Sequence, residues 1–289
     1  LRAPLSGIPL LQEGYEPIHR IAGRFGGGID IGDHDNVDVW TLVPYVTNTL
    51  AIMVALPASA ETIHVYGPGG PAPAMKEAAA TFGKANGVEV IVTAGPTPEW
   101  TGAMKADGDV IYSGSEVMMS DFVGTFAGTI MPATVTPLYM RPVGILVRPG
   151  NPKHIRGFAD LLKPGIKIAV VDGAGQQGMW EDIAGKDGDI ATLKTFRGNI
   201  MLYAKNTALA LKGWEADPSI DAWVTFPIWA KANPGVADVV PLEANRRVYR
   251  DAGVALTARG NDKPSAMAFV RFLSSPQGAA IFRKWGWQQ

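Results

Sequence analysis

The sequence predicts an α/β protein built from two lobes. Two observations support this fold class: strand-like and helix-like segments alternate from residue 61 onward, and neither repeats nor low-complexity stretches interrupt them. Alternation of this kind is typical of α/β units with mainly parallel sheets. At 289 residues, the chain has enough length in 61–289 for one large domain or two lobes.

Each predicted element rests on hydrophobic periodicity and on start and stop signals. In the first helix, Met75, Ala79 and Phe82 recur at helical spacing, and Gly87 is the stop signal. Short apolar and β-branched runs predict strands at 63–66, 88–93, 109–112, 143–147, 166–171, 221–226 and 253–257. Helical spacing predicts helices at 72–86, 116–127, 157–163, 176–185, 206–214, 264–273 and 276–284.

Two segments are interpreted as crossings between the lobes. They are Tyr139–Pro142 and Arg247–Arg250, and each leads directly into a predicted strand. The first lobe is therefore expected to comprise 61–140 plus 251–289, and the second 141–250. A cleft between two α/β lobes is a usual ligand site.

The N-terminal residues have the pattern of an export signal. The uncharged run Val39–Ala60 holds an apolar core and ends in Ala58-Ser59-Ala60, which predicts a signal peptide over 37–60 with cleavage after Ala60. A membrane anchor is the alternative, because the uncharged run is long enough to span a bilayer. Residues 1–36 lack periodicity and precede the first methionine, Met53, so they are interpreted as a non-native or disordered extension.

Composition excludes several classes of function. The net charge of −1 gives no reason to expect nucleic-acid binding. The absence of cysteine excludes thiol catalysis, disulfides, cysteine-ligated zinc and a lipid-modified N-terminal cysteine. His64 and His154 have no metal-ligand partner at useful spacing. We therefore expect a periplasmic monomer without cofactor or metal.

The run Gly67-Pro68-Gly69-Gly70 between a predicted strand and a predicted helix indicates an anion site. The first N–H groups of a helix have no partner inside it, the helix dipole is positive there, and glycine lets a ligand approach the backbone. A plain strand-to-helix turn is the alternative. The run matches neither common nucleotide-binding motif.

Several motifs resemble those of bacterial periplasmic solute-binding proteins of the molybdate and sulfate class. The C-terminal pattern Ala266–Gly278 followed by Ile281-Phe282 and Gly286-Trp287 is typical of that class, as are the runs Val110–Ser115 and Ile220–Phe226. The closest resemblance is to the accessory colonisation factor C subgroup, and its loop motifs are Tyr66–Met75, Thr93–Trp100 and Ser113–Glu116. The resemblance implies a type II periplasmic-binding fold, with two lobes joined by a two-strand hinge and closing on a small anion.

Loops after the predicted strands supply the candidate ligand-binding residues. A dehydrated oxyanion needs hydrogen-bond donors, which backbone N–H groups, hydroxyls and amides provide. The donor candidates are Gly69, Gly70, Thr97, Ser113, Ser115, Ala174, Gly175, Gln176, Asn206 and Thr207. Trp100, Tyr203 and Phe226 are expected in the core or in the cleft wall. Thr97, Ser113 and Asn206 have plain helix capping as their alternative role.

Arg141 is the one charged candidate, and it lies just before Pro142 at the expected hinge. Its planar guanidinium could bind a carboxylate or sulfonate through two hydrogen bonds. Two alternatives remain open at this point: Arg141 could bridge the lobes, or it could face solvent.

These observations predict a binding protein that captures sulfate or a similar oxyanion for an ABC-type permease in the inner membrane. A binder of an organic carboxylate or sulfonate is one alternative, and a ligand carrier that docks on a chemoreceptor is another. An enzyme is disfavoured, because the contexts of Ser113 and Ser115 do not match a nucleophile elbow and no cysteine nucleophile exists.

Overall fold

The computed structural model describes residues 61–289. The predicted extension 1–36 and the predicted signal peptide 37–60 lie outside the described residues. None of the helices in 61–289 combines the length and the apolar character needed to cross a membrane.

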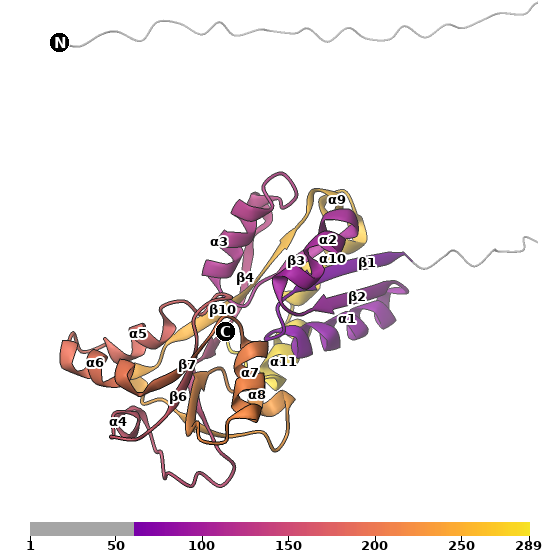
Figure 1. Ribbon diagram of the computed structural model, residues 1–289. Coiled ribbons are helices and arrows are strands. Elements are labelled where there is room, and N and C mark those ends of the chain that lie inside the picture. Colours follow the sequence, from indigo (N-terminus) through magenta and orange to yellow (C-terminus); the bar gives the residue numbers. More distant parts are fainter. Residues whose placement is uncertain (1–60) are drawn as a thin grey trace, which may run out of the picture. The chain divides into compact units, whose positions relative to one another are not determined.

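The described chain forms two five-stranded sheets with helices packed on them (Figure 1). The strand order is β2-β1-β3-β10-β4 in the first sheet and β7-β6-β8-β5-β9 in the second. Here lobe 1 denotes the first sheet with its helices, and lobe 2 the second sheet with its helices. The chain passes between the sheets at Val143 and again between Leu242 and Val248.

Lobe 1 is assembled from both ends of the described chain. Its first elements are β1 Thr62–Gly67, α1 Ala72–Asn86, β2 Glu89–Ala94, α2 Thr97–Asp107, β3 Val110–Tyr112, α3 Glu116–Thr125, the 3₁₀ turn Pro132–Thr134 and β4 Thr136–Pro142. Its last elements are β10 Tyr249–Leu256, α9 Ala258–Asn261, α10 Pro264–Leu273 and α11 Pro276–Lys284.

Lobe 2 is a continuous insertion between β4 and β10. It contains β5 Gly144–Val147, α4 Phe158–Leu161, β6 Ile168–Val171, α5 Met179–Ala184, α6 Ile190–Asn199, β7 Ile200–Ala204, α7 Thr207–Ala216, β8 Ala222–Thr225, α8 Ile228–Ala232, β9 Asp238–Pro241 and the 3₁₀ turn Ala244–Arg246.

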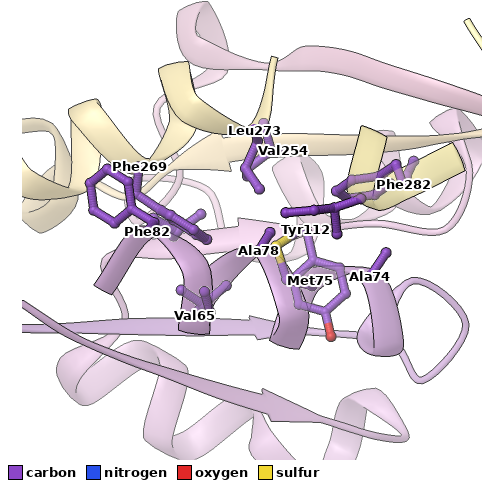
Figure 2. Packing of buried hydrophobic residues seen from close by; sticks show 14 of the residues in the cluster. Val65, Ala74, Met75, Ala78, Phe82, Tyr112, Val254, Phe269, Leu273 and Phe282 are labelled. Atoms are coloured by element: carbon purple, nitrogen blue, oxygen red, sulfur yellow. The ribbon is translucent and has the colours of Figure 1, made fainter. Parts of the chain in front are cut away.

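The C-terminal helices cover lobe 1 by packing against α1. Figure 2 shows Phe82 of α1 facing Phe269 of α10, and their ring centroids lie 5.3 Å apart. Met75 and Phe282 belong to the same buried cluster. The predicted spacing of apolar residues in these helices therefore marks the face that is buried.

The helices and strands that were not predicted are α2, β4, α6, β7, α8, β9 and α9. Pro96 and Pro98 flank the start of α2 and resemble a loop signal, yet proline is accommodated in the first helical turn. Strand β7 follows α6 without a turn residue, and β9 is a short, largely exposed edge strand of 4 residues. The sheets are mixed rather than mainly parallel, because β10 and β5 each run antiparallel to both of their neighbours.

A buried carboxylate ties the last elements of lobe 1 to the first. Asp109 is fully buried before β3 and accepts hydrogen bonds from the backbone N–H of His64, from Arg259 Nε at 3.1 Å and from Lys263 Nζ at 2.8 Å. Residues far apart in the sequence are thereby joined at one end of the sheet.

We predict that Asp109→Ala lowers the free energy of unfolding by about 3 kcal/mol, because it leaves a partly buried lysine and a backbone N–H without their partner. Urea denaturation measures the change. Asp262→Ala, which removes an exposed carboxylate nearby, is the control and should leave stability within about 0.5 kcal/mol of the parent. Equal effects of the two substitutions would contradict this role of Asp109.

Candidate functional site

A cleft of about 410 Å³ lies between loops of the two lobes. Its lobe 1 wall comes from the loops after β1, β2 and β3, and its lobe 2 wall from the loops after β6 and β7 together with α8. The carboxyl ends of parallel strands are where α/β proteins bind ligands. The cleft is lined by Pro68, Gly69, Gly70, Pro71, Gly95, Pro96, Thr97, Pro98, Gly114, Met118, Arg141, Ala174, Gln176, Lys205, Asn206, Thr207, Ala208 and Trp229.

Arg141 is a buried cation in the wall of this cleft. Its side chain extends from β4, and the residue is only 6 % exposed. The guanidinium carbon lies 3.6 Å from the ring centroid of Phe226 in lobe 2 and 4.4 Å from that of Trp287 in lobe 1. Stacking between two aromatic faces fixes the plane of the guanidinium, so its N–H groups point in set directions.

Most of the donors of this guanidinium are buried without a hydrogen-bond partner among residues 61–289. Nη2 donates to the backbone carbonyl of Gly114 at 3.3 Å, whereas Nε and Nη1 have no hydrogen-bond partner among residues 61–289. A buried polar group without a partner is uncommon and costly, and it indicates that something else completes the site.

The charge of Arg141 is only weakly compensated by the protein. Burial lowers its pKa to about 9, and the carboxylate of Asp251 opposes that shift. Burial in turn raises the pKa of the Asp251 carboxyl. Because the pKa of Arg141 still lies above neutrality, the side chain is cationic at pH 7. An anion in the cleft would therefore supply a missing counter-charge.

Two glycines make room for the guanidinium. A Cβ added at Gly70 would lie 2.8 Å from Arg141 Nη1, and one added at Gly114 would lie 3.2 Å from Nη2. Side chains at these positions would displace the arginine or separate it from the loops. The Gly67–Gly70 motif thus brings bare backbone and a cation together at the cleft, which is possible because glycine has no Cβ.

Neutral donors form part of the lobe 2 wall. Gln176 donates from Nε2 to the hydroxyl of Thr207 at 2.8 Å and accepts from the hydroxyl of buried Thr225 at 3.2 Å. These bonds hold the amide in place, and the hydroxyl proton of Thr207 stays available for a ligand. Asn206 caps α7 by accepting from the N–H of Leu209, so its side chain has the capping role that was left open.

The predicted helix at 176–185 starts later than expected. Helix α5 begins at Met179, because Ala174, Gly175 and Gly178 all have positive φ angles and form a loop. Ala174 and Gln176 therefore reach the cleft from a loop and not from a helix N-terminus.

Eight of the thirteen candidate residues line the cleft, and five lie behind it. The five are Trp100, Ser113, Ser115, Gly175 and Phe226. Trp100 is in the core and donates to the carbonyl of Gly95. Ser113 accepts from the N–H of Gly253, and Ser115 caps α3. Gly175 packs against lobe 1, and Phe226 stacks on Arg141.

Sequence reasoning missed the two largest side chains that lobe 2 adds to the cleft, Lys205 and Trp229. Lys205 is 3.9 Å from Asp172 and largely exposed, so it provides a second cation at the cleft edge. Neither residue belongs to a motif. Lys205 follows β7 and Trp229 lies in α8, and these positions could have identified them as cleft residues. Neither β7 nor α8 was predicted, however.

Within the described part of the chain, no group of three metal-binding side chains comes together. His64 lies 3.7 Å from a carboxylate oxygen of Asp107 in lobe 1 and does not line the cleft. The cleft residues are donors of hydrogen bonds and positive charge, which suits an anion and not a cation.

Solved structures with the same architecture include Peb3 and several periplasmic binding proteins. Peb3 from Campylobacter jejuni is 33 % identical over 78 % of this chain and 99 % of its own, with a TM-score of 0.73. Peb3 bound to L-phospholactate is 34 % identical over the same shares, with a TM-score of 0.74. The sulfate-binding protein SubI from Mycobacterium tuberculosis is 18 % identical over 78 % of this chain and 86 % of its own, with a TM-score of 0.66, and shows the fold alone.

The fold is the predicted type II periplasmic-binding fold. The periplasmic molybdate-binding protein of Azotobacter vinelandii shares it. That protein is 16 % identical over 78 % of this chain and 99 % of its own, with a TM-score of 0.60. A search of curated protein sequences gave no significant match. The family model described as bacterial extracellular solute-binding protein matches residues 63–288. The chain therefore belongs to the family of bacterial extracellular solute-binding proteins.

Proposed function

We propose that this protein captures a small organic anion in the periplasm, of the kind that carries a phosphate and a carboxylate, and delivers it to an ABC-type permease. One observation carries the proposal: Arg141 is a buried cation whose Nε and Nη1 have no partner among residues 61–289, and it lies beside the cleft. A fixed guanidinium fork matches the paired oxygens of a carboxylate or phosphate.

The cleft favours an organic anion over bare sulfate. Its volume of about 410 Å³ lies in the range of sites for small organic molecules. Proline, methionine and tryptophan side chains form much of its surface, which suits carbon atoms between the anionic groups. L-Phospholactate, which is bound to Peb3, has this chemistry.

Two cations at different places support a ligand with two anionic groups. Arg141 is buried in the wall from lobe 1, and Lys205 lies exposed at the edge in lobe 2. Gln176 and Thr207 add neutral donors between the lobes. Hydrogen bonds to charged ligands contribute about 1.5–3 kcal/mol each, so a few such contacts give micromolar affinity or better.

The cleft supports binding rather than hydrolysis. Among the described residues no histidine lines it, and the hydroxyls of Ser113 and Ser115 already accept hydrogen bonds from backbone N–H groups. Ser113 and Ser115 do not line the cleft either, so neither a histidine base nor one of these serines is in position there for acyl transfer. Delivery to a transporter fits the family. Docking of the monomer on a chemoreceptor is the second candidate. A pull-down from inner-membrane extracts shows whether a permease or a chemoreceptor is bound.

We predict that Arg141→Lys weakens the binding of L-phospholactate at least about tenfold, because the charge is kept while the planar fork is lost. Calorimetry with L-phospholactate, sulfate and molybdate measures the effect. Arg148→Lys is the matched control, because Arg148 stacks on Trp214 at 3.6 Å in lobe 2 and does not line the cleft.

An unchanged affinity in Arg141→Lys would contradict the proposal. Tighter binding of sulfate than of L-phospholactate by the parent protein would favour the inorganic oxyanion instead.

We predict that Arg141→Met makes the ligand-free protein more stable, by about 1–4 kcal/mol, although it abolishes anion binding. The sign follows from the lowered pKa: folding disfavours the charged arginine at pH 7, so removal of the charge removes that cost. Thermal unfolding with and without L-phospholactate tests both parts. A less stable variant would mean that Phe226 and Trp287 already compensate the charge.

Two close approaches bring the lobes into contact beside the cleft. A Cβ added at Gly175 in lobe 2 would lie 2.4 Å from Ser115 Oγ in lobe 1, and one added at Gly69 in lobe 1 would lie 3.3 Å from Trp229 in lobe 2. Both positions lie in or next to the cleft lining. Bare backbone at these points lets the lobes approach until the ligand is enclosed.

We predict that Gly175→Ala weakens ligand binding at least about tenfold by holding the lobes apart. Gly178→Ala is the matched control, because Gly178 also has a positive φ, of 69° against 79°, but has no atoms near its missing Cβ. Both variants should lose similar stability, whereas only Gly175→Ala should lose affinity by calorimetry. Equal affinities would show that closure does not depend on this contact.

A further inference from the structure

A second cavity of about 370 Å³ is lined by Phe226 and Arg141. Its walls come from lobe 2 through Phe226, Ile228 and Val239, and from the end of the chain through Trp285. Apart from Arg141, none of its lining residues lines the first cleft. It is therefore a separate cavity that also spans both lobes.

The walls of this cavity are fixed in position. Trp285 donates from Nε1 to Glu77 at 2.8 Å, and its ring packs against the hydrophobic core of lobe 2. Phe226 is fully buried and Ile228 is 6 % exposed. A rigid apolar wall with few polar groups is typical of a preformed small-molecule site.

The charges that line this cavity are all positive. Arg141 contributes its guanidinium charge, and Lys231 contributes an ammonium group. Lys231 donates to the carbonyl of Lys284 and lies 5.7 Å from the ring centroid of Trp285, which leaves further N–H groups of the ammonium for a ligand. Within residues 61–289, no aspartate or glutamate lines this second cavity.

We propose that the second cavity binds a small apolar monocarboxylate, with an aromatic or branched aliphatic body. The apolar side chains contact the body, Lys231 contacts the carboxylate, and Arg141 adds positive charge to the wall. This proposal does not rest on the proposed function of the first cleft. Lys231, Ile228, Val239 and Trp285 do not line that cleft.

The two sites influence each other through one guanidinium. Arg141 lines both cavities, so an anion in the first cleft offsets its positive charge and lowers its attraction for an anion in the second. Each ligand therefore weakens the other without occupying the same space, and by linkage the effect has the same size in both directions.

Phenylacetate is a suitable probe, with phenylacetamide as its uncharged counterpart. The full chain is labelled with 5-fluorotryptophan, and the ¹⁹F resonance of Trp285 is assigned with Trp285→Phe. We expect phenylacetate to shift this resonance to saturation with a Kd below about 10 mM, and phenylacetamide to bind at least about tenfold more weakly.

Variants of the two cavities test the location. Lys231→Gln should weaken phenylacetate binding at least about tenfold, whereas Thr207→Ala in the first cleft and Lys212→Gln on an exposed face of α7 should not. Saturating L-phospholactate should weaken phenylacetate binding by a limited factor and not exclude it. The proposal is overturned if the Trp285 resonance does not move at about 10 mM phenylacetate, if Lys231→Gln has no effect, or if Thr207→Ala abolishes the shift.

Discussion

The guanidinium of Arg141, held between Phe226 and Trp287, is the interaction on which the rest of the site depends. It joins an aromatic ring of each lobe through a single cation. Because that cation is buried without a full set of partners in 61–289, the loops around it must offer backbone and empty space, and Gly70 and Gly114 do so. The composition of the Gly-rich loop is thus explained by a residue that is distant from it in the sequence.

Sheet topology explains how this arginine reaches the boundary between lobes. Strands β4 and β10 pair antiparallel at the edge of the lobe 1 sheet, with Arg141 opposite Arg250. The chain connects both strands to lobe 2, so residues at this register lie at the boundary between the lobes. Arg250 reaches Asp182 of α5 at 2.5 Å, whereas Arg141 lies inside. Two neighbouring arginines therefore have different roles: one joins the lobes at the surface, and the other faces the cleft.

Those features that are encoded locally could be predicted from the sequence. Alternating periodicity predicted the α/β class, and the strand-to-helix loops identified Gly70, Thr97 and Thr207 as cleft residues. Features that depend on pairing between distant segments were not accessible in this way. The direction of the Arg141 side chain follows from strand register. Lys205 lines the cleft because it follows the edge strand β7, and no turn signal marks the start of that strand in the sequence. Ser113 and Ser115 matched a donor motif but satisfy backbone groups instead.

The two lobes contribute different chemistry, and this difference bears on ligand release. Lobe 1 supplies the buried charge, whereas Gln176 and Thr207 of lobe 2 supply neutral donors that are already linked to each other. Separation of the lobes would take Phe226 away from one face of Arg141 and expose the guanidinium to water. Water would then compete for the same N–H groups, and the higher dielectric would weaken the attraction to the anion. For the anion proposed above, closing the lobes would also strengthen its interaction with Arg141, so a partner that opened the lobes would loosen it.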